Sequence, residues 1–286
     1  MKMEERSFVT ETVAINYATN RGDGPPVILL HGMMDRWQNC LPLARALGER
    51  WRVFAPDMRG HGRSERAPTG VYRLADLTAD VVAFAEAVVG EPAVFFGHSA
   101  GAFAALEATA LHPHLSCGVI LGDMAFDLDH LEGITSTPES IGYHRALREL
   151  AGLPIPEIAD RLETMRPDLI GSIRAAMAPA LHRLDPRVLD FHAEGRVRDL
   201  LGDFNGDYLL GQVESPTLLI QADPRLGAVM TDGYVSHALG LLSSGSHIRL
   251  EGTDHNLGLD RQSAEPLVDA VLGFLESLPP GRTTSA

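Results

Sequence analysis

The stretch GHSAG at residues 97–101 follows directly on the apolar run AVFF at residues 93–96. Its two glycines bracket Ser99, and the helix-forming sequence AFAALEATAL comes next. A tight turn from a buried strand into a helix needs small residues, because the chain there passes close to neighbouring elements. Such a turn also holds a serine hydroxyl clear of the backbone at the carboxyl end of the strand. The stretch therefore predicts either a plain strand-to-helix turn or a nucleophilic serine.

Short apolar runs alternate with helical patterns along most of the chain, which is typical of βαβ units and a mainly parallel sheet. This rhythm stops at residues 125–212, where segments with prolines near their starts have helical periodicity and no strand pattern. We therefore expect an α/β core of residues 1–124 and 213–286 and a helical cap of residues 125–212. The expected strands are 12–17, 27–30, 53–55, 93–96, 117–121, 217–220 and 247–250.

The bulk composition excludes several classes of protein. A formal net charge of −14 argues against nucleic-acid and anionic membrane partners, which need a basic surface. The first residues, MKMEERSFVT, lack the apolar core of a signal peptide, and no apolar run approaches the ~20 residues of a membrane span. Cys40 and Cys117 form no CxxC or Cys/His cluster, so neither zinc nor another metal is expected. These observations predict a cytoplasmic monomer or homodimer that acts on a small molecule.

A nucleophilic serine needs a base to take its proton, and that base is usually histidine. In this order of elements the base must follow Ser99 in the chain and lie in the loop after the last strand. The sequence HIRLEGTDHNLGLD at residues 247–260 has that pattern, and it places His255 in the loop. His255 is therefore the predicted base, against the alternative of an ordinary solvated loop histidine.

The histidine in turn needs a carboxylate that fixes its tautomer and stabilises the imidazolium ion. Asp223 is the first choice, because it follows the strand TLLIQ in the stretch ADPRLG. An Asp-Pro pair can also do no more than start a turn. Asp123 is the alternative acid, since it follows the preceding strand and could reach the same histidine. Asp232, expected to cap a helix, and Asp254 are weaker candidates.

Acyl transfer also requires hydrogen-bond donors for a tetrahedral oxyanion. The sequence LLHGMMDRWQN at residues 29–39 provides a loop directly after a strand. The backbone N–H groups of Met33 and of Ala100, the residue after the nucleophile, are the predicted donors. His31 and Gly32 would shape this loop, although it could also be a plain strand-to-helix turn.

These landmarks together resemble the α/β-hydrolase family over roughly residues 13–278. They are HG at 31–32, DMRGHGRS at 57–64, GHSAG at 97–101, an acid after a late strand and a late histidine. The resemblance implies an α/β-hydrolase core with a mostly parallel central sheet and a helical cap inserted after the sixth strand. It assigns roles to Ser99 (nucleophile), His255 (base), Asp223 (acid), and Met33 and Ala100 (oxyanion donors). Many members place glycine and two spacer residues before the acid, and ADPRLG is shorter than that pattern.

The expected reaction is hydrolysis of a small or medium carboxylic ester or lactone through an acyl-enzyme, without a cofactor. The serine in the GHSAG turn argues against the epoxide hydrolases and haloalkane dehalogenases of the family that this chain resembles, because those members use aspartate at this position. Carbon–carbon bond hydrolysis, cofactor-free perhydrolysis and ligand binding without turnover stay open as alternatives. The cap is expected to roof the pocket. Candidate lining residues, for each of which core packing is the alternative, are His31, Trp37, Met124, Phe126, Tyr143 and Met177.

Overall fold

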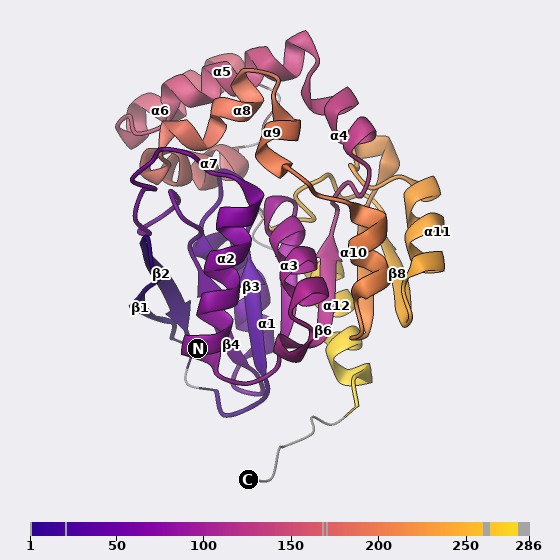
Figure 1. The fold of residues 1–286 in the computed structure, drawn as a ribbon. Coiled ribbons are helices and arrows are strands. Elements are labelled where there is room, and N and C mark those ends of the chain that lie inside the picture. The colour runs from indigo at the N-terminus through magenta and orange to yellow at the C-terminus, as the bar shows by residue number, and fades with distance from the viewer. Residues whose placement is uncertain (1, 21, 168, 170, 260–263, 280–286) are drawn as a thin grey trace.

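An eight-stranded sheet runs through the protein, and helices cover both of its faces (Figure 1). The computed structural model describes residues 2–20, 22–167, 169, 171–259 and 264–279. The strands are β1 (Glu4–Val9), β2 (Ala14–Thr19), β3 (Pro26–Leu30), β4 (Arg52–Pro56), β5 (Ala93–His98), β6 (Ser116–Gly122), β7 (Thr217–Ala222) and β8 (Gly245–Leu250). Their order is β1-β2-β4-β3-β5-β6-β7-β8. Only β2 pairs antiparallel, with β1 and β4, so the expected mostly parallel sheet is confirmed.

Alternate side chains of the central strands point into two separate apolar layers. In β3, Ile28 and Leu30 lie in one buried cluster, whereas Val27 and Leu29 lie in the other. This period of two is the geometry of a strand that is buried on both faces. The first layer packs under α2 (Leu74–Phe84), α3 (Ala100–Leu111), α10 (Gly206–Gln212) and α11 (Asp232–Leu241). The second packs under α1 (Leu41–Leu47) and α12 (Glu265–Ser277).

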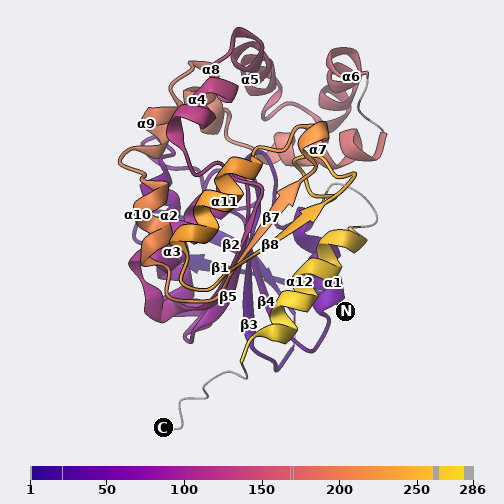
Figure 2. The same cartoon turned by 90° about the vertical axis from the view of Figure 1, so that its right-hand side faces the viewer.

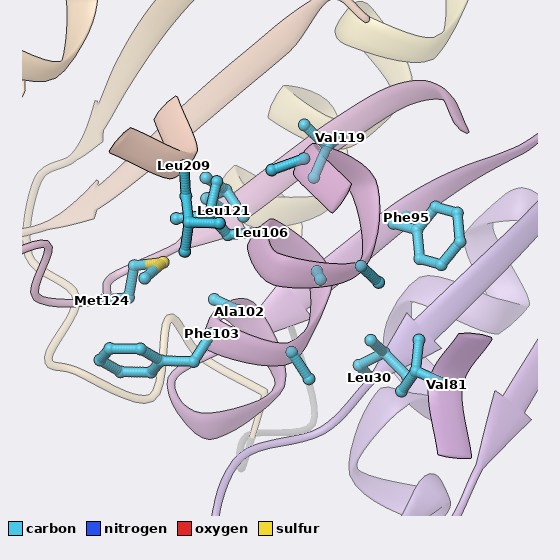
Figure 3. Packing of buried hydrophobic residues seen from close by; sticks show 14 of the residues in the cluster. Leu30, Val81, Phe95, Ala102, Phe103, Leu106, Val119, Leu121, Met124 and Leu209 are labelled. Carbon is cyan, nitrogen blue, oxygen red and sulfur yellow. The ribbon is translucent and has the colours of Figure 1, made fainter. Parts of the chain in front are cut away.

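Helix α3 lies at the centre of the first layer. Figure 3 shows Phe95, Val119 and Leu121 of the strands beside Ala102 and Leu106 of this helix. All five side chains are fully buried. Because α3 begins at the end of β5, this packing fixes the turn between the two elements and therefore the position of Ser99.

The helical cap follows β6, as predicted. Its helices are α4 (Leu128–Thr135), α5 (Pro138–Leu150), α6 (Ile155–Met165), α7 (Gly171–Arg183), α8 (Asp190–Ala193) and α9 (Val197–Leu201). Local sequence sets where they begin: Thr137 caps α5 by accepting a hydrogen bond from the backbone N–H of Ser140, and Pro138 takes the first helical position. The cap helices contribute most of a third buried cluster, which includes Leu147, Ile158 and Leu181 and extends to Ala67 and Tyr72 of the core.

The cap helices lie beyond one end of the sheet, whereas α10 lies beside α3 (Figures 1 and 2). Leu209 and Leu210 of α10 belong to the same buried cluster as Phe95. The last helix of the insertion thus packs with the core layer, and α4 to α9 form the part that covers the sheet end. Short 3-10 or π segments are η1 (Trp37–Cys40), η2 (Ala85–Val89), η3 (Pro113–Leu115), η4 (Pro186–Leu189) and η5 (Pro224–Leu226).

Candidate active site

Ser99 occupies a turn in which the positions two residues before and two residues after it, Gly97 and Gly101, admit no side chain. Its backbone has φ 51° and ψ −117°, in the sparsely populated region of positive φ. A Cβ on Gly97 would lie 2.4 Å from the carbonyl oxygen of Gly101, and one on Gly101 would lie 2.4 Å from that of Leu30. The backbone N–H of Ser99 donates to the carbonyl of Gly122 on β6 at 3.0 Å. The small residues of GHSAG are therefore required by the close approach of neighbouring backbone.

The loop after β8 brings His255 to this serine. Nε2 of His255 lies 3.1 Å from Oγ of Ser99. On the other side of the ring, Nδ1 lies 2.7 Å from Oδ2 of Asp123. A carboxylate can only accept, so Nδ1 carries the proton and Nε2 is left as an acceptor for the serine hydroxyl. The predicted pairing of Ser99 with His255 is thus present as a contact.

Asp123 stands directly after β6 with φ 39° and is fully buried. Its carboxylate accepts hydrogen bonds from the backbone N–H groups of Ala222 (3.2 Å), Val229 (2.9 Å) and Met230 (3.2 Å). Together with His255 these are four donors for one carboxylate, whose ionised form has acceptor sites only. The three backbone groups fix the carboxylate, and the histidine then takes its orientation from it.

The first choice for the acid, Asp223, is wrong as the partner of His255. Its carboxylate caps η5 by accepting from the backbone N–H of Arg225 and forms a fork with the Arg225 guanidinium at 2.9 and 2.6 Å. It also accepts from the backbone N–H of Gly252 at 2.9 Å. The Arg225 side chain and the Gly252 N–H lower the pKa of Asp223 below its ordinary value. The Asp223 carboxylate therefore binds Arg225 and Gly252 in place of His255, and it stabilises the loops that follow β7 and β8.

The two weaker candidates for the acid have other partners. Asp232 is the first residue of α11, and Thr231, not Asp232, caps that helix. The Asp232 carboxylate accepts from the side-chain amide of Gln221 at 2.9 Å. Asp254 lines the cavity beside His255, and its carboxylate accepts from the backbone N–H of Asn256 at 3.1 Å.

The two predicted oxyanion donors both belong to the cavity wall next to Ser99. Ala100 is the first residue of α3, and the first N–H groups of a helix have no intrahelical acceptor. Among the described residues, the N–H of Met33 has no hydrogen-bond acceptor either. Both groups are therefore available to an oxygen bound beside Ser99, and the N-terminus of α3 adds a favourable field for negative charge.

Two buried histidines hold the Met33 loop against the loop of residues 57–61. His31 donates from Nδ1 to the carbonyl of Gly32 (2.8 Å) and accepts at Nε2 from the backbone N–H of Met58 (3.0 Å). His61 accepts at Nε2 from the backbone N–H of Met34 at 3.4 Å. Burial lowers the pKa of His31 to about 4 and that of His61 to about 3, so both rings are neutral. The sequence did not indicate this role for His61.

His98, the residue before the serine, supports the loop that carries the base. Its Nε2 donates to the backbone carbonyl of His255 at 2.7 Å. The ring is buried, and burial lowers the pKa of His98 to about 3. Two adjacent residues of the GHSAG motif thus contact His255. His98 donates to its backbone carbonyl, and Ser99 is hydrogen-bonded to its side chain.

Ser99, His255 and Asp123 lie at one wall of a cavity of about 420 Å³ between the sheet and the cap. Of the predicted lining residues, Met124, Tyr143 and Met177 do line it. The other three do not, and those expectations are wrong. Trp37 packs in the second core layer and donates from Nε1 to Glu5, Phe126 packs in the first layer, and His31 lies under the oxyanion loop.

Part of the cavity wall was not indicated by the sequence. It comprises polar side chains from the cap and from the loop after β3: His144, His192, Arg166, Asp35 and Asn39. Isolated polar residues in helical or loop patterns have no signal that separates them from solvated ones. Over the described part of the chain, no cluster of three His, Cys, Asp or Glu residues has the geometry of a metal site. None of the described helices is long and apolar enough to cross a bilayer.

Comparison with known proteins agrees with this architecture. The family model for the alpha/beta hydrolase fold matches residues 25–136. A putative non-heme haloperoxidase of Mycobacterium phage D29 is 30% identical over 145 residues, which cover 50% of this chain and 52% of that protein. Epoxide hydrolase B of Mycobacterium tuberculosis (strain ATCC 25618 / H37Rv) is 35% identical over 117 residues, 40% of this chain and 33% of that protein.

Among solved structures, that of E-2-(acetamidomethylene)succinate hydrolase has a TM-score of 0.75 at 19% sequence identity, and the match covers 96% of this chain and 100% of that one. The chain thus has the alpha/beta hydrolase fold, and its residues 25–136 match the model of that family, in agreement with the resemblance of its motifs. It spans about half the length, or less, of the two curated relatives described above.

Proposed function

We propose that this chain is a serine hydrolase that cleaves a small or medium carboxylic ester or lactone through an acyl-enzyme. The observation that carries the proposal is the hydrogen-bonded line from Asp123 through His255 to Ser99, with contacts of 2.7 and 3.1 Å. A serine hydroxyl is a weak nucleophile until a base takes its proton. A base that is itself oriented by a buried carboxylate is the arrangement that acyl transfer requires.

The reaction follows from the positions of these atoms. Nε2 of His255 takes the proton of Ser99 while Oγ attacks the carbonyl carbon, and Asp123 stabilises the imidazolium ion. The N–H groups of Met33 and Ala100 donate to the oxyanion. His255 then gives its proton to the leaving oxygen, which leaves the acyl group on Ser99. A water that gives its proton to His255 attacks this ester, and His255 returns that proton to Oγ of Ser99 as the carboxylic acid leaves.

The shape of the cavity supports the choice of substrate size. A volume of about 420 Å³ under a helical roof suits a small or medium molecule better than a polymer or a lipid surface. Side chains such as Met33, Phe103, Met124 and Met177 make much of the wall apolar. An ester or lactone with an apolar acyl or alkyl part fits this wall.

A fluorophosphonate tests for the activated serine, because it phosphonylates serines whose hydroxyl is deprotonated by a neighbouring base. We expect one adduct by intact mass on the wild-type protein and none on Ser99→Ala. Ser236→Ala is the matched control, since Ser236 lies exposed on α11, and it should react like the wild type. Absence of an adduct on the wild type would contradict the proposal and favour a ligand-binding protein.

A substrate panel then separates the reactions that the same three residues can carry out. Esters and lactones are compared with β-diketones, for carbon–carbon cleavage, and with peroxide plus a carboxylic acid, for perhydrolysis. We expect ester or lactone hydrolysis to have the highest kcat/KM and to fall by at least ~10³-fold in Ser99→Ala. A higher kcat/KM for a diketone or for peroxide would overturn the ester assignment while retaining the nucleophile.

A further inference from the structure

Two histidines of the cap face the same cavity as Ser99, and the proposed reaction does not use them. His144 lies on α5 and His192 on α8, and both line the cavity. Their ring centroids are 4.9 Å apart with an angle of 36° between the planes. Polar side chains in a mostly apolar pocket generally fix the orientation of a ligand. This pair is therefore a candidate for binding part of a ligand.

The hydrogen bonds of His144 define its tautomer. Its Nδ1 lies 2.8 Å from the backbone carbonyl of Ser140, one turn earlier in α5. Because a carbonyl only accepts, Nδ1 carries the proton. In the neutral ring Nε2 is then unprotonated, and in the described part of the chain it has no donor. His144 offers the cavity a hydrogen-bond acceptor.

The neighbouring ring has the opposite character. Nδ1 of His192 is buried and, among the described residues, has no hydrogen-bond partner. A proton placed there would bury an N–H donor without an acceptor, which is costly. Nε2 is not enclosed in this way, so the proton belongs on Nε2, where it can reach the cavity. His192 offers the cavity a hydrogen-bond donor.

Both rings are uncharged. Burial, and to a smaller extent the nearby His144, lower the pKa of His192 to about 3, and burial lowers the pKa of His144 as well. A neutral donor beside a neutral acceptor complements a group that accepts and donates at one atom. A hydroxyl does both, whereas a carboxylate would place its charge against the lone pair of His144.

We propose that His144 and His192 form a hydroxyl-binding subsite under the cap, which selects substrates with an alcohol group on the part remote from the scissile bond. This inference rests on the proposed ester hydrolysis and names the substrate class for it. The donor–acceptor pair binds a hydroxyl within the apolar wall, and the remaining chain of the substrate spans the distance to Ser99. His192 is thereby a specificity-determining residue.

The test compares para-nitrophenyl esters of a medium-chain acid that differ at one carbon. One ester is unsubstituted, a series carries a hydroxyl at successive positions of the chain, and others carry an oxo group or a terminal carboxylate. One or two added hydrogen bonds correspond to roughly a tenfold gain. We expect kcat/KM for the hydroxyl ester at one position to exceed that of the plain ester by about this factor, mainly through KM.

Variants of the two histidines test whether the preference for the hydroxyl ester depends on their rings. His192→Leu and His144→Leu should bring the ratio of hydroxyl to plain ester close to one. His192→Gln should retain part of it, because a glutamine amide can donate from nearly the same place as Nε2. His114→Leu is the matched control, since that histidine is exposed on η3 and lies outside the cavity wall. It should leave the ratio unchanged.

Binding separates this inference from the proposed reaction. Calorimetry with Ser99→Ala, which holds the esters intact, should show the same preference, and His192→Leu in that background should remove it. A preference in binding without turnover by the wild type would support the subsite and contradict the hydrolase. Turnover with no preference, with a preference for the carboxylate, or with a hydroxyl preference that both leucine variants keep would overturn the subsite.

Discussion

The carboxylate of Asp123 and the imidazole of His255 lie 2.7 Å apart although 132 positions separate them in the chain. Asp123 follows β6, and His255 lies in the loop after β8, two strands away in the sheet. The carboxyl ends of parallel strands meet at one edge, which explains how the chain brings the two together. Backbone N–H groups of the segment after β7 already hold the carboxylate in place. The fold thus positions the carboxylate of the proposed acid.

Replacing Asp123 by asparagine should remove activity. The amide can no longer fix Nδ1–H of His255, so Nε2 is not kept as the free acceptor for the Ser99 proton. In serine proteases the same change lowers kcat by about 10⁴. We expect a fall of at least ~10³ in kcat for an ester that the wild type hydrolyses, measured under saturating substrate.

Asp223→Asn is the matched control, because this aspartate follows the adjacent strand and is equally buried. Its partners are Arg225 and the N–H of Gly252, so the variant should lower the melting temperature and keep activity within about tenfold. Loss of activity in Asp223→Asn together with retention in Asp123→Asn would reverse the assignment of the acid.

The sequence placed Ser99, His255, Met33 and Ala100 at one site, and the structure has all four at the same cavity, because each has a fixed place relative to a strand end. It could not choose between Asp123 and Asp223, because both follow neighbouring strands and therefore end at the same edge. The choice depends on where each side chain points. Asp123 has a positive φ that no composition rule reveals. Arg225, two residues after Asp223, was the available signal of a competing partner.

The fold was predicted more completely than the pocket. Runs such as PVILL are apolar on both faces, and their short length favours a buried strand over a helix. The sequence did not predict strand β1, because EERSFV is mostly polar. This strand pairs only with β2 at the sheet edge, and all of its residues are partly or fully exposed. Trp37 was misplaced for a similar reason, since an aromatic residue near a loop suits either the core or a pocket. Only the packing of η1 against the second layer decides between them.

A second prediction concerns the contribution of the turn at residues 97–101 to stability. A methyl group on Gly101 would meet the carbonyl oxygens of Leu30 and His31 at 2.4 and 2.6 Å. These atoms are backbone of β3 and of the loop that follows it, so they cannot move without disturbing the sheet. We expect Gly101→Ala to lower the free energy of unfolding by about 2–4 kcal/mol, measured by urea denaturation.

Gly240→Ala controls for the general effect of removing a glycine. Gly240 lies within α11, and a Cβ there would have no neighbour within 4 Å. Alanine is the better helix former by roughly 1 kcal/mol, so this variant should be neutral or more stable. Equal stability of the two variants would show that the close approach of Gly101 to the backbone of Leu30 and His31 does not require a glycine.

A third prediction concerns the buried ion pair between Arg59 and Asp80. Nε and Nη2 of Arg59 lie 2.6 and 2.7 Å from the two carboxylate oxygens of Asp80, with side-chain exposures of 7% and 9%. Removal of the Asp80 charge leaves the buried Arg59 with only the longer contact to the half-exposed Asp76, at 3.6 Å. Asp80→Asn should therefore destabilise the protein by about 3–5 kcal/mol in urea denaturation.

Two further variants test this explanation. Arg161→Met breaks the exposed pair with Glu157 on α6 and should change stability by less than about 0.5 kcal/mol. The double variant Arg59→Met, Asp80→Leu should recover part of the loss, because no unpaired charge is left. If Asp80→Asn and Arg161→Met had the same effect, burial would not be what makes the Arg59 pair important.

The buried histidines predict that the protein becomes less stable as the pH falls. Burial lowers the pKa of His31 to about 4 and that of His61, His98 and His192 to about 3, whereas in the unfolded chain these rings titrate near 6.5. Between these values the unfolded chain binds more protons than the folded protein. Stability is therefore complete above about pH 6.5 and is lost as the pH falls towards 4, by up to about 1.4 kcal/mol per pH unit for each ring.

The measurement is the urea midpoint at several values between pH 7.5 and about 4.5, where most carboxylates are still ionised. His192→Gln removes one of the four rings, so its midpoint should fall less steeply with pH than that of the wild type. His114→Gln removes an exposed histidine and should reproduce the wild-type slope. A midpoint independent of pH over this range would mean that the four rings accept protons in the folded protein, and their hydrogen bonds at the active-site loops would then need a different assignment.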